Sequence, residues 1–508
     1  MDIYDFEHMA QDKGVRGWLI ELKAMQKDEK TRDEVNARLR DHWRTISGLL
    51  NHEDAKVRKN AALILGEAGI QAAVDVLGPA YLSETTLFVR PAYLTALGQL
   101  DYRKYMDVLK ERLEQLRQME IAPSDRKHLE EERHLLSELL DMAQGSGRHS
   151  YCGKVKSRLI LVVKKGLEDI VFSELQERFP KCGARKMNGG VMVSTDDPAV
   201  FERLRTWQSM LFLFCRDNGF EKDGEAIARG IMAQEVFTYL NERHHGTGAW
   251  RFRVDVRTRD DAGEKAALAK KTAFALEALG DGHFLNSTSD YEIEFVLMEG
   301  KEGKVFAYLR LHTLMDHRFD YRQRFTAASM NPVSAALMIA LCRPYFRENA
   351  NILDPFCGVG TLLLERKFCG DAYKKLRIRS LYGLDIYGNA VDFGRENARN
   401  CGCLVNFIQR DFFDFTHSYL FDEVITDTPE SFKDEDAATA FFTRFLKKLM
   451  GHLSPTGRVF IYTQSIGALR EALKANGQFR TLLERPFLAK GSAWVMILEV
   501  SKEITNKL

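Results

Sequence analysis

The stretch ANILDPFCGVGTLLLE, residues 350–365, decides the fold of the last third of this chain. An apolar run ends at Asp354 and a second begins after the glycines, which predicts a short buried strand, a turn and a helix. Gly358 and Gly360 allow the turn to adopt backbone angles that other residues disfavour, and they let a ligand approach the backbone closely. The stretch therefore predicts a ligand-binding turn in an α/β domain.

Two classes of ligand bind such turns, and the residues around the glycines distinguish them. In the fingerprint of dinucleotide-binding domains a third glycine follows three residues after the second, where this chain has Leu363. The carboxylate of Asp354 would repel the pyrophosphate of a dinucleotide, whereas it would attract a cofactor that carries an ammonium group. The comparison favours S-adenosylmethionine over a nicotinamide dinucleotide.

Three further strands are expected to end in carboxylates, in the order that this fold requires. Asp385 is placed to accept hydrogen bonds from both ribose hydroxyls. Asp411 is placed to accept one from the adenine amine, with Phe412 nearby as a packing surface. Asp427 ends the strand beside which the methyl acceptor would enter. A single aspartate is more often a helix cap or turn residue, but joint placement at successive strand ends predicts a cofactor site.

The remaining residues complete an α/β sheet. Apolar patterns predict helices over 435–452 and 465–475, and strands over 458–463, 481–487 and 493–500. The last two strands are closely connected, so we expect an antiparallel pair at the sheet edge, unlike a purely parallel dinucleotide domain. Residues 326–508 are therefore predicted to form a Rossmann-like methyltransferase domain.

The N-terminal region, residues 1–147, reads as helix after helix and contains an internal repeat. Val57-Arg58 is followed by Leu65-Gly66, and the same spacing returns 32 residues later, within 89–98. Paired helices with a period in this range predict an α-solenoid, and the repeat resembles HEAT repeats. An irregular helical bundle is the alternative. Stacked helix pairs present an extended surface, so this region is expected to dock a protein partner.

Between these regions, residues 153–325 have the pattern of an α+β region. It follows a charged helix over 124–142 and a glycine-containing boundary at 144–148. The predicted strands cover 157–163, 189–193, 250–256, 291–297 and 304–311, and the predicted helices cover 167–179, 198–208 and 265–279, with one more beginning at 227.

One predicted strand of this region carries four arginines on one face. Arg251, Arg253, Arg257 and Arg259 alternate along it with residues of the opposite face. A solvated outer face would give this pattern. A surface that contacts phosphates would give it too, because guanidinium groups suit phosphate oxygens.

Residues from about 155 to 505 resemble the THUMP-domain family of RNA methyltransferases, which modify the exocyclic amine of guanine in transfer or ribosomal RNA. The stretches 330–338 and 352–364 carry the resemblance on the cofactor side, and the order of the central elements carries it on the RNA side. The stretch 315–322 is similar to the segment that joins the two parts. The resemblance implies a multidomain chain: an N-terminal HEAT-like α-solenoid, a central ferredoxin-like and THUMP-like α+β region, and a C-terminal α/β methyltransferase sheet.

The resemblance and the strand-end pattern together give a set of site residues. S-adenosylmethionine is expected to be bound by Asn331, Asp354, Phe356, Gly358, Gly360, Thr361, Asp385, Ile386, Asp411 and Phe412. RNA is expected to be contacted by Arg251, Arg253, Arg257, Arg259, Arg318 and Arg322. Catalysis is assigned to Asp427 and Pro429. No metal is expected, because the 8 cysteines are scattered and only Cys401 and Cys403 are closely spaced, with no second pair.

The chain departs from the family at the end of the fourth strand. Family members that methylate exocyclic amines carry Asn-Pro-Pro-Tyr or Asp-Pro-Pro-Tyr there, so that an acceptor aligns the amine and an aromatic ring stacks on the base. This chain keeps Asp427 and Pro429, but Thr428 replaces the first proline and Glu430 replaces the aromatic residue. Phe432 could supply the ring only if the loop differs. The departure admits a protein that has lost the chemistry.

Composition excludes few functions. With 73 basic and 72 acidic residues the formal charge is +1, so any surface for nucleic acid must be local. No run approaches the length of a membrane span, and scattered cysteines suit a reducing compartment, so a cytoplasmic protein without a membrane partner is expected. Three functions remain open: an RNA methyltransferase, a scaffold that binds RNA, and a protein methyltransferase. The sequence does not give the oligomeric state.

Overall fold

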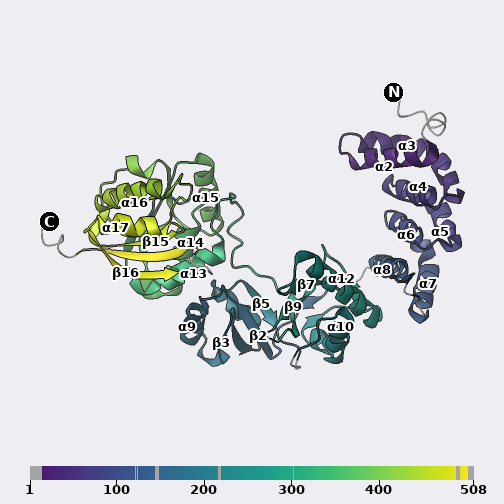
Figure 1. Cartoon of the computed structure of the whole chain (residues 1–508), viewed down its shortest axis with the longest axis horizontal. Helices are drawn as coiled ribbons and strands as arrows, with labels where there is room; N and C mark the ends of the chain where they lie inside the picture. The colour runs from purple at the N-terminus through teal and green to yellow at the C-terminus, as the bar shows by residue number, and fades with distance from the viewer. Residues whose placement is uncertain are drawn as a thin grey trace. The chain divides into compact units, whose positions relative to one another are not determined.

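The structure, a computed structural model, describes residues 14–119, 122, 124–143, 148–215, 219–300, 302–487 and 492–501 (Figure 1). Contacts divide the chain into two compact units. The first comprises Met1–Cys152 and Phe214–Thr313, and the second comprises Gly153–Leu213 and Leu314–Leu508. The boundary expected at 144–148 lies outside the described residues except for Arg148. The domain limits proposed from the sequence therefore stay predictions.

The first unit begins with paired helices. They are α2 (Gly14–Lys27), α3 (Arg32–Gly48), α4 (Ala55–Glu67), α5 (Val74–Ser83), α6 (Arg90–Leu97), α7 (Met106–Gln118) and α8 (Arg126–Ala143). Helices α2, α4, α6 and α8 pack against one another in succession, whereas α3 packs on α4, α5 on α6 and α7 on α8. Figure 1 shows α2, α4 and α6 in one row of this stack. This is the architecture of the expected α-solenoid.

The repeated residues explain why the helix pairs stack. A Cβ on Gly66 would lie 2.5 Å from the Cα of Ala96, so α4 and α6 can approach this closely only with glycine there. The repeated arginines both bind carboxylates from later segments. Arg58 Nε donates to Glu84 at 2.8 Å, and Arg90 Nη1 donates to the buried Glu132 at 3.1 Å.

The rest of the first unit is an α+β part. Its elements are α10 (Gly224–Ala233), α11 (Val236–Asn241), β7 (Trp250–Arg257), α12 (Ala262–Leu279), β8 (Phe284–Asn286), β9 (Ile293–Glu299) and β10 (Val305–Leu311). The strands are ordered β10-β9-β7-β8, with β10 antiparallel to β9 and β7 parallel to both β8 and β9. Helix α10 packs on α12. Helix α8 packs on β8, where His134 Nδ1 lies 2.8 Å from Glu277 Oε1.

The second unit begins with a small antiparallel sheet. Its elements are β2 (Ser157–Val162), α9 (Glu168–Arg178), β3 (Arg185–Met187), β4 (Gly190–Thr195) and β5 (Ser209–Phe212). The strand order is β3-β4-β2-β5, and all three pairings are antiparallel. The ferredoxin-like assignment of this part stays a prediction.

The helix predicted over 198–208 is wrong in its second half. A 3₁₀ helix covers only Pro198–Arg203; Leu204 is extended, and residues 205–208 belong to no helix. Their side chains point to different partners: Arg205 binds Glu365, whereas Thr206 donates to the buried Glu174 at 2.7 Å. Tertiary contacts of this kind override the local apolar spacing from which the helix was inferred.

The C-terminal part of the second unit is a doubly wound sheet. Its strands are β11 (Ala350–Asp354), β12 (Ile378–Asp385), β13 (Asn406–Gln409), β14 (Phe421–Asp427), β15 (Leu453–Thr463), β16 (Phe479–Pro486) and β17 (Trp494–Val500). Its helices are α13 (Pro332–Cys342), α14 (Thr361–Ala372), α15 (Gly388–Asn400), α16 (Glu435–Met450) and α17 (Ile466–Lys474).

The order of this sheet is β13-β12-β11-β14-β15-β17-β16. The first five strands are parallel to their neighbours, and β17 is antiparallel to β15 and β16. This confirms the antiparallel edge expected from the closely connected last strands. Because the chain reverses its winding between β11 and β14, the carboxyl ends of these strands border a crevice in which such folds bind ligands.

A buried ion pair and an apolar core fix the elements beneath that crevice. Arg366 on α14 donates through Nε to Glu423 on β14 at 2.9 Å, and both side chains are fully buried. Phe442, Phe445 and Leu446 of α16 pack into the core beside β14 and β15. Among the described residues, none of the helices is long and apolar enough to cross a membrane.

Candidate functional site

The turn after β11 has the left-handed backbone angles that its glycines predicted. Gly358 has φ +51° and Gly360 has φ +79°. A Cβ on Gly360 would lie 2.6 Å from the ring of Phe407, whereas a Cβ on Gly358 would meet no protein atom within 4 Å. Gly360 is therefore needed for packing, and Gly358 leaves space for a ligand.

The carboxylate of Asp385 joins this turn to the end of β12. Its Oδ2 accepts a hydrogen bond from the backbone N–H of Gly358 at 2.9 Å. Its Oδ1 accepts one from the N–H of Tyr387, also at 2.9 Å. The carboxylate is partly exposed and each oxygen can accept further bonds, so it can still receive the two hydroxyls of a ribose.

A cavity of about 1100 Å³ lies at the carboxyl ends of the strands. Its lining includes eleven of the twelve residues that the sequence assigned to the cofactor or to catalysis: Asn331, Asp354, Phe356, Gly358, Thr361, Asp385, Ile386, Asp411, Phe412, Asp427 and Pro429. The twelfth, Gly360, lies behind the turn against Phe407. The fold therefore brings these residues to one place, although their individual roles stay predictions.

Asp354 is the most deeply buried carboxyl group of the cavity. It is 1% exposed, and Oδ1 accepts the N–H of Phe356 at 3.1 Å. Burial raises its pKa well above the ordinary value, and the neighbouring Asp427 and Asp385 raise it further. A ligand that brings a positive charge to this carboxyl group would favour its ionised form, as an ammonium group does.

The hydroxyl of Thr361 also suits a polar ligand. Its Oγ1 is buried at the start of α14 and lines the cavity, but within the described part of the chain it has no hydrogen-bond partner. Unpaired buried polar atoms are costly, and they commonly mark where a ligand or an ordered water binds. The residues at this end of the cavity thus fit S-adenosylmethionine, which has both charged and hydrogen-bonding groups.

Two predicted cofactor residues also have structural partners. Asn331 caps α13, and its Oδ1 accepts the N–H of Val333 at 3.0 Å. Asp411 caps the turn after β13, and its Oδ1 accepts the N–H of Phe413 at 2.8 Å. Phe412 is 1% exposed and packs into the core, whereas the adjacent Phe413 is partly exposed at the cavity.

The opposite end of the cavity carries the altered motif. Asp427 ends β14 directly opposite Tyr462 of β15, and both residues line the cavity. Burial and the nearby Glu430 raise the pKa of Asp427 to about 7. Burial also raises the pKa of Tyr462, to about 12, as do the charges of Asp427 and Glu430. The charges of Asp427 and Glu430 therefore influence the pKa values of the neighbouring groups at this end of the cavity.

The loop after Asp427 is fixed by hydrogen bonds to the neighbouring strand. The N–H and the hydroxyl of Thr428 donate to the carbonyl of Tyr462 at 3.1 and 3.2 Å. Glu430 Oε1 accepts the N–H of Gln464 at 2.8 Å. Phe432 turns toward the core, where its ring lies 5.2 Å from that of Phe441, and it is not among the residues that line the cavity. Phe432 therefore does not replace the missing aromatic residue.

Sequence reasoning passed over several cavity residues. Tyr462, Phe413, Phe441 and Arg444 all line it, and they come from β15, the turn after β13, and α16. Tyr462 is the aromatic residue nearest to Asp427 along the sheet, because the two occupy paired positions. Its place depends on strand register, which no local motif of the sequence encodes.

A second hollow, of about 540 Å³, adjoins the cavity and shares Phe413 and Arg444 with it. Its other lining residues are Thr416, His417, Lys447, Lys448, Gly451 and His452. All of these are described residues, and none is a carboxylate. The guanidinium of Arg444 lies over the ring of Phe413 at 3.8 Å. The hollow is therefore a positively charged surface beside the cavity.

The arginines assigned to RNA are not gathered in one exposed cluster. Arg251 donates to Asp290 at 2.7 Å, Arg253 donates through Nε to Glu294 at 2.6 Å, and Arg257 pairs with Asp255 at 2.7 Å. Arg259 Nη2 donates to the carbonyl of Gly300 at 3.1 Å. These pairings occupy part of each guanidinium, and the RNA-binding role of the strand stays a prediction.

The two arginines of the joining segment also have internal partners. Arg318 is 4% exposed, lies over the ring of Trp207 at 3.1 Å and pairs with Asp316 at 2.7 Å. Arg322 Nη2 donates to the carbonyl of Met330 at 3.1 Å. Both hold the segment that leads into the cavity, and neither lines it. No cluster of metal ligands is found among the described residues.

Comparison with protein families identifies two regions of the chain. Residues 320–485 match a family described as an RMKL-like methyltransferase domain. These residues form a methyltransferase domain. Residues 44–118 match HEAT repeats, in agreement with the internal repeat and the stacked helices. No curated protein matches the chain closely enough to be counted.

Solved structures with a similar fold cover about two thirds of the chain. TrmN from Thermus thermophilus is 21% identical, with a TM-score of 0.52 over 68% of this chain and 100% of that one. A protein called a predicted N6-adenine-specific DNA methylase, from Listeria monocytogenes, is 18% identical, with a TM-score of 0.51 over 68% and 96%. A methyltransferase crystallised with SAH is 17% identical, with a TM-score of 0.50 over 68% and 98%. These likenesses show the fold, and the cofactor expected from the sequence agrees with them.

Proposed function

We propose that the protein is an S-adenosylmethionine-dependent methyltransferase that acts on RNA, with a guanine exocyclic amine of transfer or ribosomal RNA as its target. The single observation that carries the proposal is the cavity, in which the strand-end carboxylates meet Asp427. The solved methyltransferase that holds SAH has the same fold, which supports the cofactor. S-adenosylmethionine would supply an electrophilic methyl group there.

Each end of the cavity has a distinct task in this proposal. Asp385 would hold the ribose of the cofactor and Asp354 would attract its ammonium group, while Asp427 lies among the residues of the same cavity that would meet the acceptor. Asp427 would accept a hydrogen bond from the amine and would thereby direct the nitrogen lone pair at the methyl group. When the new N–C bond forms, one amine proton must leave, and the raised pKa of Asp427 near neutrality suits a group that takes it.

The hollow beside the cavity supports nucleic acid as the acceptor class. Arg444, Lys447 and Lys448 give it a positive charge, and phosphates bind such surfaces with counterion release. Tyr462 and Phe413 offer aromatic rings at the cavity, on which a base can stack. The charged hollow and these rings together support a nucleic acid as the acceptor.

The experiment that tests the proposal is transfer of labelled methyl from S-adenosylmethionine to total RNA, to DNA and to protein in separate reactions. Transfer to RNA, with a methylated guanine in the digest by nucleoside mass spectrometry, is the expected result. Transfer to DNA or protein alone would change the substrate class. Cofactor binding without transfer to any acceptor would favour the second candidate, an RNA-binding scaffold, which the replacement of the family's aromatic residue by Glu430 supports.

A further inference from the structure

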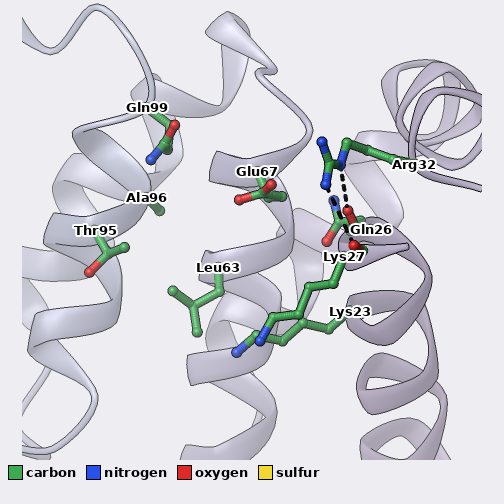
Figure 2. Close-up of a pocket in the computed structure, with 9 residues that line it drawn as sticks. All are labelled: Lys23, Gln26, Lys27, Arg32, Leu63, Glu67, Thr95, Ala96 and Gln99. Carbon is green, nitrogen blue, oxygen red and sulfur yellow. Dashed lines mark hydrogen bonds between the residues drawn. The ribbon is translucent and has the colours of Figure 1, made fainter. Parts of the chain in front are cut away.

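The helical repeats of the first unit contain a cavity of about 250 Å³ that methyl transfer does not use. Figure 2 shows three neighbouring helices, α2, α4 and α6, that each turn side chains into it. The lining residues are Lys23, Gln26, Lys27, Arg32, Leu63, Glu67, Thr95, Ala96 and Gln99. All of them belong to the N-terminal solenoid.

The repeat itself produces this cavity. Leu63 and Glu67 lie one turn apart on α4, and Thr95 and Gln99 follow them at the same 32-residue interval as the repeated motif. Equivalent positions of successive repeats therefore face the same side of the stack. Such rows of inner helices form the binding surfaces of α-solenoids.

The α2 side of the cavity is positively charged. Figure 2 shows Lys23 and Lys27 extending side by side toward Leu63. No described carboxylate lies within ion-pair distance of either ammonium group. Burial lowers the pKa of Lys23, and the charges of Lys27 and Lys59 lower it further. The ammonium groups thus repel one another, and an anion between them would relieve that repulsion.

Arg32 fixes the edge of this charged side. Its Nε donates to the carbonyl of Gln26 at 3.1 Å, and its Nη2 donates to that of Lys27 at 3.5 Å. These bonds hold the end of α2 in place, and Figure 2 shows them as dashed lines. Gln26 is itself buried and bound to Asn36 at 2.9 Å. The lysines are therefore presented from a fixed helix end.

The rest of the cavity is unlike a surface for a continuous chain of phosphates. Glu67 stands in the middle of it, between the lysines and the α6 side, where it would repel the next phosphate of a nucleic acid. Leu63 offers an apolar contact, and Thr95 and Gln99 offer neutral hydrogen-bonding groups. Peptide N–H groups could donate to Glu67 and Gln99, while an acidic side chain reaches the lysines.

We propose that this cavity binds an acidic peptide segment of a partner protein, whose carboxylates meet Lys23 and Lys27 and whose backbone crosses Glu67 toward Gln99. The assignment goes beyond methyl transfer and does not depend on it. It gives the solenoid a specific docking site for a protein that carries a short acidic and apolar segment.

Fluorescence anisotropy with the full chain tests the assignment. The probe is a labelled short peptide of glutamate, leucine and glycine, and the comparison probes are its glutamine counterpart and a single-stranded RNA of equal charge. The acidic peptide should bind more tightly than both. Lys23→Glu together with Lys27→Glu should weaken its binding roughly tenfold or more, as expected for lost charge-assisted bonds. Gln99→Ala should weaken it by a smaller factor.

Lys110→Glu with Lys127→Glu is the matched control, because both lysines are exposed on α7 and α8 and neither lines the cavity. Equal far-ultraviolet circular dichroism of both double variants would show that the helices are intact. Peptide affinity unchanged by the Lys23 and Lys27 changes would overturn the proposal. Tighter binding of RNA than of the peptide, lost in the same variant, would replace the acidic peptide with nucleic acid as the occupant.

Discussion

Asp427 and Glu430 lie at the acceptor end of the cavity, and their carboxyl groups influence each other. The charge of Glu430 adds to burial in raising the pKa of Asp427 to about 7. If the ionised form of Asp427 accepts the amine hydrogen, methyl transfer should rise with pH through about 7. Glu430→Gln removes the like charge, so the midpoint of the pH profile should move to lower pH. Single-turnover methylation across pH measures both midpoints.

Asp427→Asn should remove this midpoint from the pH profile and reduce methyl transfer by ~10²-fold, with cofactor affinity unchanged.

The same substitution should also alter how the stability of the protein depends on pH. Because the folded protein keeps a proton on Asp427 up to about 7, which the unfolded chain loses near 3.8, this group makes stability fall as pH rises between those values. Asp436→Asn, on the exposed first turn of α16, is the control. A midpoint near 7 that survives Asp427→Asn would assign the titration to another group.

Asp385 carries the cofactor prediction. Its carboxylate already accepts the N–H groups of Gly358 and Tyr387, so its loss removes a ribose partner and also loosens the glycine turn. Asp385→Ala should weaken S-adenosylmethionine binding by roughly ten- to a hundred-fold, the equivalent of about 1.5 to 3 kcal/mol. Asp385→Asn keeps one acceptor and should lose less. Titration calorimetry measures the cofactor affinity of both Asp385 variants, with Asp392→Ala as the exposed control. A cofactor affinity of Asp385→Ala equal to that of the wild type would remove Asp385 from the site.

At the scale of elements, α16 connects the cavity to the charged hollow. Lys447 and Lys448 lie in its last turn, where they also complement the helix dipole. The double variant Lys447→Glu, Lys448→Glu should weaken RNA binding about tenfold or more. The slope of the logarithm of the RNA-binding constant against the logarithm of the salt concentration should become shallower by roughly 0.7 for each lost phosphate contact. The control is Lys374→Glu with Lys375→Glu, in an exposed turn of the same domain, which should change neither the RNA affinity nor its salt dependence.

Filter binding at several salt concentrations gives the RNA affinities, and calorimetry gives the cofactor affinity. Cofactor affinity should be the same in both double variants, because neither lysine pair lines the cofactor cavity. An RNA affinity and salt slope equal to those of the wild type would exclude the hollow from RNA binding. That result would leave the assignment of the cofactor cavity untouched.

The elements also separate what the sequence could predict from what it could not. The strand-end aspartates were found because a strand, a turn and a helix leave a local pattern, and the parallel sheet then brings their carboxyl ends together. Tyr462 was missed because its position opposite Asp427 depends on the register of β14 with β15. The strand β5, Ser209–Phe212, was missed because its pairing with β2 is a tertiary contact that no local pattern of the sequence encodes.

The charged strand β7 shows a different limit. Its alternating arginines were visible in the sequence, but the carboxylates that engage them come from β9, from the strand itself and, for Arg251, from Asp290 in the segment before β9. Arg253 reaches Glu294, which is paired with it across the sheet. The sequence pattern predicts which side chains share one face of a strand, but it does not predict which side chains of neighbouring segments pair with them.

At the scale of the whole molecule, the two assigned sites are separate in the chain. The cofactor cavity is lined by residues between Thr326 and Gln464, and the solenoid cavity is lined by residues between Lys23 and Gln99. They also belong to different compact units. A deletion that removes the solenoid should therefore leave the cofactor cavity complete.

Deletion of residues 1–143 tests this separation. Cofactor affinity should be unchanged, and binding of the acidic peptide should be lost. Thermal stability of the remaining α+β part should fall, because α8 packs on β8 and Glu277 loses the His134 imidazole. The Glu277 carboxylate raises the pKa of His134 above its usual value against the effect of burial, so this contact stabilises most at low pH and weakens as pH rises through that pKa.

A milder variant separates docking from folding. His134→Ala removes the imidazole but keeps the solenoid, so its melting temperature should be lower than that of the wild type at acidic pH, and the difference should shrink as pH rises. Scanning calorimetry at several pH values measures this. If the deletion instead abolishes cofactor binding while His134→Ala binds normally, the solenoid is required for the methyltransferase domain to fold. The two sites would then depend on one another, although their linings share no residue.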